Sequence, residues 1–180
     1  MKTTLAFLFT LFFSVQSLAA DLQGKDVGQW LESMKALEPW MQKHQPTLEQ
    51  EMQGQQNPEL MFKRTTAMLK KHGLYDEFNG QVQKQGYRNV EHWSQVTEQV
   101  TFAWMALEMQ QNKAEVEAAK AQYDAMKNNP NIPAEQKKMM EQMMGQAFSM
   151  MRMAEKASPA DRLAVESHQL ALRKHFNKDQ

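Results

Sequence analysis

Residues 89–107 read NVEHWSQVTEQVTFAWMAL, and this stretch is the strongest fold signal in the chain. Asn89 is a preferred residue type for capping the N-terminus of a helix. The apolar residues after it recur at helical spacing and form one stripe: Trp93, Val96, Val100, Ala103, Trp104 and Leu107. A second apolar face carries Phe102, Met105 and Met109. Because a helix that is apolar on two sides is buried, we predict that this one lies at the centre of the packing.

The same helix is predicted to continue to Lys127, which would make it about 57 Å long. Its second half carries four alanines spaced 4, 3 and 4 positions apart: Ala114, Ala118, Ala121 and Ala125. Such a spacing places small side chains on one helix face, where another helix can approach closely. A turn is predicted at Asn128–Pro133, where two prolines and three asparagines lie together.

Upstream, a helix capped by Asp26 carries apolar residues along one face: Val27, Trp30, Leu31, Met34 and Leu37. Pro39 is expected either to kink this helix or to start a second segment, and Pro46 is expected to interrupt it again. A further helix is predicted to begin at Asn57-Pro58 and to stop at Gly73. A shorter one begins near Leu74 and ends at Gly86.

Downstream, a methionine-rich helix is predicted from Ala134 to Ala157, and a last helix begins at Ser158-Pro159 and extends through Phe176. No segment alternates like a strand, and the composition favours helix because Met, Gln, Ala, Lys, Glu and Leu are abundant. We therefore predict an all-α fold: a single-domain bundle of about six helices with one long central helix, over residues 20–180.

The first residues have the three-part layout of a signal peptide. Lys2 supplies the positive charge, an apolar run extends from Leu5 to Val15, and small residues follow at Ser17 and Ala19. The apolar run is too short to span a bilayer, which needs about 20 residues. We predict a signal peptide over residues 1–19 and a periplasmic protein, with secretion as the open alternative. No cysteine lies near the predicted cleavage site, so we do not expect a lipid-anchored lipoprotein.

Charge and cysteine content exclude several partner classes. The chain has 21 basic and 21 acidic residues and no cysteine. A balanced charge provides no global field that would attract nucleic acid or an anionic membrane, so neither is expected as a partner. No later segment reaches the length of a membrane span. Without cysteine an exported protein forms no disulfide, so its hydrophobic core alone must hold the fold.

Catalytic motifs are missing from the sequence. Thiol chemistry is excluded, no serine lies in a Gly-x-Ser-x-Gly elbow, and the few glycines form neither a phosphate loop nor a dinucleotide fingerprint. Neither His-Glu-x-x-His nor Glu-x-x-His occurs, which disfavours a helical zinc site or a carboxylate-bridged iron site. We therefore expect a protein that is not an enzyme and has no cofactor. A haem held between Met and His without covalent attachment stays open.

The methionine cluster is the most distinctive feature. Seven methionines lie between Met139 and Met153, and the pairs Met139/Met143 and Met140/Met144 share helix faces. Methionine fills irregular gaps at helix interfaces, so one interpretation is a core or a homo-oligomer interface. A second is an adaptable surface for a partner or an unfolded client. The residues predicted for this partner surface are Met139, Met140, Met143, Met144, Met150 and Met151.

A third interpretation of the same cluster is copper binding. Thioethers are soft ligands that suit Cu(I). The candidate ligands are Met139, Met140, Met143, Met144, His168 and His175. His168 and His175 are seven positions apart on one side of the last predicted helix.

The four tryptophans, Trp30, Trp40, Trp93 and Trp104, each lie within a helical apolar pattern and are expected in the core. Of the four, Trp40, beside Pro39, is the one we most expect to be partly exposed and to contact a ligand.

Several short motifs resemble a recurring pattern in small exported helical proteins of Gram-negative bacteria, which are themselves uncharacterised. These motifs are Lys71-His72-Gly73-Leu74-Tyr75, Gly86-Tyr87, Trp93 and Ala103-Trp104-Met105-Ala106-Leu107. The resemblance implies a helical fold and an exported protein, and it carries no functional residue. The chain is also similar in class and compartment to small periplasmic helical chaperones, although it lacks their Leu-Thr-x-x-Gln signature. We expect a non-enzymatic periplasmic protein with an interaction, scaffold or chaperone-like role, and metal binding is the alternative.

Overall fold

The structure, a computed structural model, describes residues 21–52 and 58–176. Within these ranges the chain forms eight α-helices and no strand, so the predicted all-α class is confirmed. The helices are α1 (Gly24–Met52), α2 (Pro58–Lys71), α3 (Tyr75–Lys84), α4 (Val90–Gln111), α5 (Lys113–Asn128), α6 (Ala134–Ala154), α7 (Pro159–Glu166) and α8 (Gln169–Phe176). The predicted signal peptide lies outside the described residues.

Helix α4 lies at the centre of the fold, as its apolar pattern predicted. It packs against α1, α2, α3, α6 and α7. All six residues of its predicted stripe are buried, and Phe102 on the second face is buried as well. Asn89 caps the helix because its side-chain oxygen accepts a hydrogen bond from the backbone amide of His92 at 2.9 Å.

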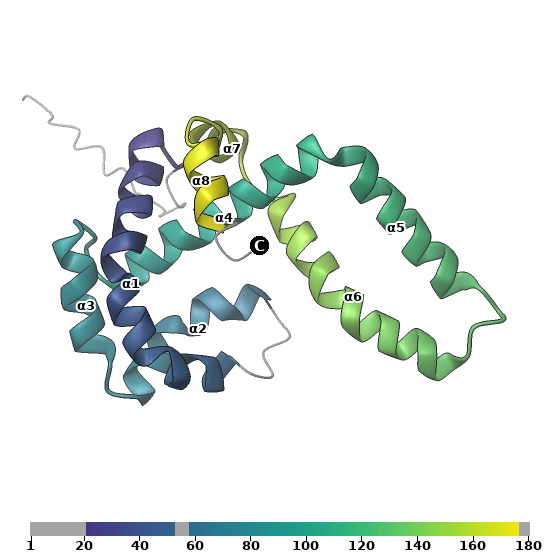
Figure 1. Cartoon of the computed structure of the whole chain (residues 1–180), viewed down its shortest axis with the longest axis horizontal. Coiled ribbons are helices and arrows are strands. Elements are labelled where there is room, and N and C mark those ends of the chain that lie inside the picture. Colours follow the sequence, from purple (N-terminus) through teal and green to yellow (C-terminus); the bar gives the residue numbers. More distant parts are fainter. Residues whose placement is uncertain (1–20, 53–57, 177–180) are drawn as a thin grey trace, which may run out of the picture.

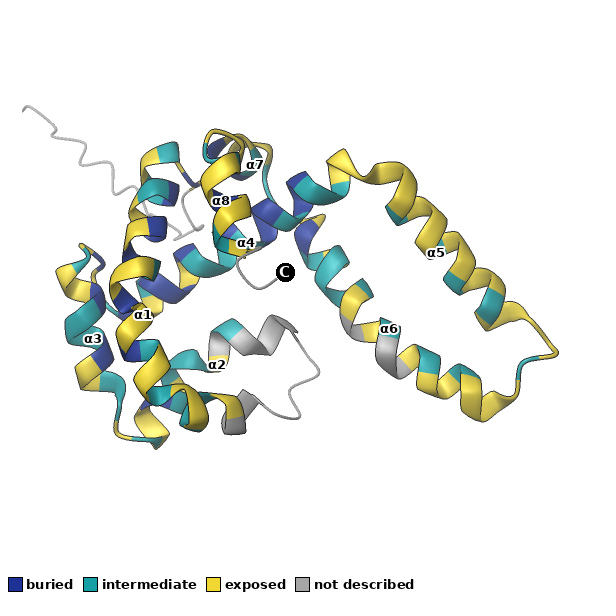
Figure 2. Cartoon of the chain, in the orientation of Figure 1, coloured by how far each residue is buried: buried dark blue, intermediate teal, exposed yellow. Residues whose placement is uncertain are grey.

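Two parts are visible in the chain (Figure 1). A body is formed by α1 to α4 with α7 and α8, and an arm formed by α5 and α6 projects away from it. Figure 2 shows buried residues concentrated in the body and mainly exposed residues along the arm. This arrangement differs from the predicted bundle of about six helices. Although α6 contacts α2 and α4, the other described helices do not surround the hairpin of α5 and α6.

The predicted long central helix is wrong, because the helix ends and restarts at Asn112. The backbone of Asn112 has φ −108° and ψ 29°, which is not helical. Its side-chain amide donates a hydrogen bond to the carbonyl of Glu108 at 3.0 Å. Such a bond to the preceding turn competes with the regular helix and bends it. Figure 1 shows α5 leaving in a different direction from α4.

The predicted interruptions of the first helix are also only partly correct. Helix α1 continues through both Pro39 and Pro46 as one element. The ribbon changes direction toward its C-terminal end in Figure 1, which is the kink that an internal proline produces. The face of α1 with Val27, Trp30 and Leu37 is buried against the other helices of the body, as predicted.

Most turns and caps follow the residues that predicted them, but Asp26 does not cap the first helix. Helix α1 already begins at Gly24, and the Asp26 carboxylate within its first turn accepts a hydrogen bond from the backbone amide of Gln23 at 2.9 Å. Gly73 and Gly86 have φ values of +67° and +86°, the left-handed conformation that glycine adopts most easily after a helix. Ser158 caps α7 by accepting a hydrogen bond from the amide of Asp161 at 3.0 Å.

The predicted last helix is divided in two. It stops at Ser167, whose hydroxyl donates a hydrogen bond to the carbonyl of Ala164 at 2.7 Å and contacts Nδ1 of His168 at 2.9 Å. Helix α8 then begins at Gln169.

A polar contact inside the core ties α1 to α4. The indole N–H of Trp93 donates to Oγ of Ser33 at 3.2 Å, and that hydroxyl donates to the carbonyl of Trp30 at 2.7 Å. Ser33 is fully buried, so these partners satisfy a hydroxyl that would otherwise be costly to desolvate.

Among the described helices, none is both long and apolar enough to cross a membrane.

Candidate functional site

The arm holds a partly open apolar strip between its two helices. The ring of Tyr123 on α5 lies 4.7 Å from the ring of Phe148 on α6, measured between centroids. The residues that share these two helix faces are half-buried, and we call them the inner strip: Val116, Tyr123, Met126, Met140, Met144, Phe148 and Met151. A hollow of about 380 Å³ lies beside Tyr123, Phe148 and Met151. The two helices therefore touch without sealing their shared interface.

Two ion pairs connect the helices of the arm at its edges. Lys127 lies 3.2 Å from the carboxylate of Glu141, and Lys120 lies 3.1 Å from that of Glu155. Hydrogen bonding to Glu141 raises the pKa of Lys127 above its ordinary value. Ion pairs as exposed as these are largely screened by solvent, so they align the helices but add little to the stability of the arm.

The methionines predicted as a partner surface lie along α6. Met139 is 61% exposed, and the half-buried members are Met140, Met144, Met150 and Met151. The side chain of Met143 lies outside the described residues. Helix α6 is thus not buried on both faces, because Ala154, at its junction with the body, is its one buried residue among those described.

The alanine seam does not pack against another helix as predicted. Ala114, Ala118, Ala121 and Ala125 are all exposed on the outer face of α5. The face of α5 that contacts α6 carries Tyr123 instead, because larger apolar side chains bury more surface than alanine does.

The histidines predicted as metal ligands belong to the body. His168 lies beside α1, where its ring is the nearest side chain to Gly28. His175 packs edge-on against Trp30 with ring centroids 5.1 Å apart. Figure 1 shows α8 well separated from the outer half of α6, which carries Met139 to Met144, so the fold does not bring the two groups together. In the described part of the chain, no three His, Asp or Glu side chains are placed to hold a metal ion.

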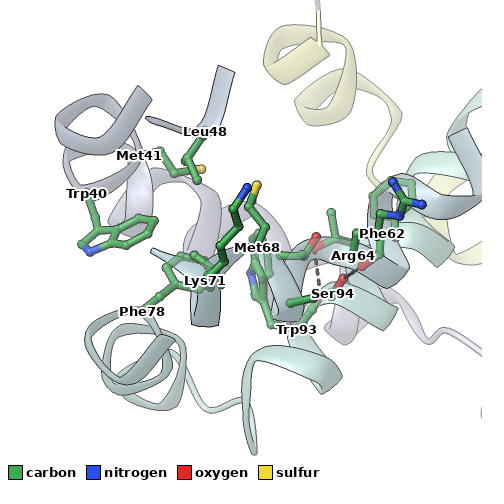
Figure 3. Close-up of a pocket in the computed structure, with 14 residues that line it drawn as sticks. Trp40, Met41, Leu48, Phe62, Arg64, Met68, Lys71, Phe78, Trp93 and Ser94 are labelled. Atoms are coloured by element: carbon green, nitrogen blue, oxygen red, sulfur yellow. Dashed lines mark hydrogen bonds between the residues drawn. The ribbon is translucent and has the colours of Figure 1, made fainter. Parts of the chain in front are cut away.

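A second candidate site is an apolar pocket inside the body. Its volume is about 420 Å³, within the usual range of about 300–1,000 Å³ for small-molecule sites. Side chains from α1, α2, α3 and α4 line it (Figure 3). Its aromatic wall is continuous, because Phe78 lies 4.5 Å from Trp40 and 5.2 Å from Trp93 between ring centroids.

Hydroxyl groups that line the pocket already have partners. Ser94 donates a hydrogen bond to the carbonyl of Phe62 at 3.1 Å. Thr97 donates to the carbonyl of Trp93 at 2.8 Å and accepts from the indole of Trp30 at 3.0 Å. These hydroxyls are used within the protein, so the interior of the pocket favours an apolar guest.

The charged residues among the described lining residues are Arg64 and Lys71, both on α2. In Figure 3 the amine of Lys71 lies beside the sulfur of Met68, whereas Arg64 lies at the other end of the pocket, near Phe62. The pocket therefore has an apolar wall and two cations at its edges.

Trp40 is buried, so the predicted partial exposure is wrong. Its ring nevertheless lines the pocket, and its indole nitrogen is buried without a hydrogen-bond partner among the described residues. The expected ligand contact stays a prediction. Apart from Trp40, sequence reasoning missed this pocket, because its lining comes from four helices that only the tertiary fold brings together.

These features define an all-helical protein with a partly open apolar pocket in its body and a two-helix arm that projects from the body. No protein-family model matches the chain, and no curated protein or solved structure matches it. The resemblance to small exported helical proteins of Gram-negative bacteria therefore stays a prediction.

Proposed function

We propose that this chain is a non-enzymatic protein of the bacterial periplasm that binds apolar segments of other polypeptides along the inner strip of its arm. The observation that supports this role is the exposure of α5, in which no residue is buried. A two-helix hairpin can bury only one face of each helix, and here that face is only half-buried. A third, amphipathic segment that lies along the strip would cover it.

The chemistry of the strip suits a weakly selective binder. Methionine has a flexible, polarisable side chain that adapts to partners of different shape. The arm between Lys113 and Ala154 carries six basic and five acidic residues, so it does not select a strongly charged partner. We infer a chaperone-like role toward unfolded or partly folded exported chains.

A matched pair of arm variants tests this proposal. Met140→Lys/Met144→Lys places two charges in the inner strip, and Ala118→Lys/Ala125→Lys places two charges on the exposed outer face of α5. The assay measures how much protein suppresses the aggregation of heat-unfolded luciferase. We expect wild type and the outer-face variant to suppress it equally, and the inner-strip variant to need at least about fivefold more protein, because a buried charge without a partner is costly.

Absence of suppression by the wild-type protein, or equal suppression by both variants, would contradict the proposal. Sedimentation of the same three proteins tests self-association. A stable wild-type dimer that only the inner-strip variant dissociates would assign the strip to a homo-oligomer interface instead.

The compartment has its own test. If residues 1–19 are a cleaved signal peptide, protein recovered from the periplasmic fraction begins at Ala20. An intact N-terminus, or protein confined to the cytoplasmic fraction, would contradict the proposed location.

Copper binding is the second candidate function, and it is favoured only by the shared half-buried face of Met140 and Met144. Titration with Cu(I) of the wild type and of Met140→Leu/Met144→Leu separates the two functions. Stoichiometric binding that the variant loses would support copper, and no binding would end that proposal.

A further inference from the structure

We propose that the pocket between α1, α2, α3 and α4 binds a single-chain amphiphile with an anionic head group. The apolar chain lies against the aromatic wall, and one of the two cations on α2 holds the head. This is a small-molecule site in the body, and it does not depend on the proposed role of the arm.

The apolar part of the ligand follows from the lining. Trp40, Phe78 and Trp93 form a continuous wall with ring centroids about 5 Å apart. Met41, Leu48 and Met68 add flexible aliphatic surface. Such a lining favours an unbranched hydrocarbon chain, which can follow an irregular apolar surface and needs no hydrogen-bond partner.

The charge of the head group follows from the cations. The charged side chains among the described lining residues are both basic, and no acidic side chain joins them. Arg64 and Lys71 are seven positions apart, two turns of one helix, so they lie along the same edge about 10 Å from each other. An anionic head therefore meets a cation at either end of the pocket, whereas a cationic head would be repelled.

The geometry also shows how the head can reach a cation. Figure 3 shows the Lys71 side chain beside that of Met68, with its amine next to the sulfur. Met68 is half-buried and Lys71 is exposed, so this amine borders both the apolar lining and solvent. Arg64 is exposed and offers a planar donor pair that fits carboxylate or phosphate.

A fluorescence titration tests the proposal, because Trp40 and Trp93 line the pocket. The probes share a twelve-carbon chain and differ in the head: dodecanoate, dodecyl phosphate, dodecanol and dodecyltrimethylammonium. The three charged probes are kept below their micelle concentrations, and dodecanol is kept below its solubility limit. We expect saturable changes in tryptophan emission with one ligand per chain. Either anion should bind at least about tenfold more tightly than the alcohol, and the ammonium should bind most weakly. The ratio of the two anions identifies whether a carboxylate or a phosphate head is preferred.

Two variants at one position distinguish the effect of charge on ligand binding from the effect of disrupting the pocket. Met68→Glu and Met68→Lys both place a charge at the same half-buried site, and they differ only in sign. Dodecanoate should bind Met68→Lys at least about tenfold more tightly than Met68→Glu. Circular dichroism of both variants checks that the fold is retained. If neither folds, the neutralising variants below decide the question.

Neutralising variants identify the cation. Arg64→Gln or Lys71→Gln should weaken dodecanoate binding about tenfold, whereas the control Lys84→Gln on α3 should not change it. Equal affinity for all four probes, no saturable signal with dodecanoate, or no loss in either α2 variant would overturn the proposal. The inner-strip variant of the arm should bind dodecanoate like the wild type, so failure of one proposal is distinguishable from failure of the other.

Discussion

The backbone amide of Leu22 donates a hydrogen bond of 2.6 Å to Oδ1 of Asp161, across 139 positions of the chain. Asp161 is 7% exposed, and its own amide donates to the capping hydroxyl of Ser158. One buried carboxylate thus joins the segment before α1 to the first turn of α7, where the positive end of the helix dipole also favours an acid.

This contact predicts a measurable loss of stability in Asp161→Ala. The substitution leaves the buried amide of Leu22 without its acceptor, which should lower the free energy of unfolding by about 1–3 kcal/mol. Urea unfolding measures the change. Glu166→Ala, an exposed change on the same helix, is the control and should stay within about 0.5 kcal/mol of wild type. Equal stability of the two variants would mean that the hydrogen bond contributes nothing.

The break at Asn112 predicts that a residue on α4 and a residue on α5 lie closer together than they would in one continuous helix. A chain without cysteine can be labelled cleanly at Gln95→Cys and Ala125→Cys, two exposed positions on either side of the break. A continuous helix would place these positions about 45 Å apart. Pulsed electron spin resonance should give a clearly shorter separation, because α5 departs in another direction. A distance near the straight-helix value would restore the single long helix.

The arm should open more readily than the body. Helix α5 has no buried residue, whereas α4 has ten, and local stability follows buried apolar contacts. Hydrogen exchange followed by mass spectrometry should show amides in residues 113–128 exchanging at least about tenfold faster than those in residues 96–107. If the amides of residues 113–128 were protected as well as those of residues 96–107, and this protection persisted when the protein is diluted, the arm could not be uncovered. Protection that disappears on dilution would indicate a second copy as its cover.

The environment of His92 predicts that the folded protein becomes less stable in mild acid. Burial lowers the pKa of His92 below its ordinary value of 6.5, and repulsion by Arg88 lowers it further. The amide of Arg88 also donates to Nδ1 of His92 at 3.4 Å, and a protonated ring could not accept that bond. Because the unfolded chain binds the proton more tightly, the contribution of His92 is complete above pH 6.5 and is lost as the pH falls below that value.

The variant His92→Gln isolates this contribution. Urea unfolding at about pH 7.5 and about pH 5.5 gives the loss of stability for each protein. Wild type should lose more than the variant, since the other titrating groups are shared. An identical loss in both proteins would show that His92 does not titrate differently in the folded state.

Local signals in the sequence were sufficient for the class of the fold and for most helix ends. The periodic stripe from Trp93 to Leu107 predicted a central helix, and Asn89, Gly73 and Ser158 marked boundaries that the structure retains. These features depend on residues within a few positions of each other, so the sequence of a single helix is enough to predict them. The breaks at Asn112 and Ser167 were missed, because at both positions a side chain bonds to the preceding turn within an otherwise helical pattern.

Tertiary structure alone decided which apolar faces are covered. Judged from the sequence alone, the alanine seam of α5 and the methionines of α6 were equally suited to packing. Which of them is buried depends on the helix that lies opposite. The position of that helix depends in turn on the direction of the chain after Asn112. The pocket has the same origin: Trp40, Met68, Phe78 and Trp93 come from four helices, and nothing in their spacing along the chain specifies that they meet. The sequence determined helices and their apolar faces through short-range periodicity, whereas long-range packing decided which of those faces remain open to a partner or a ligand.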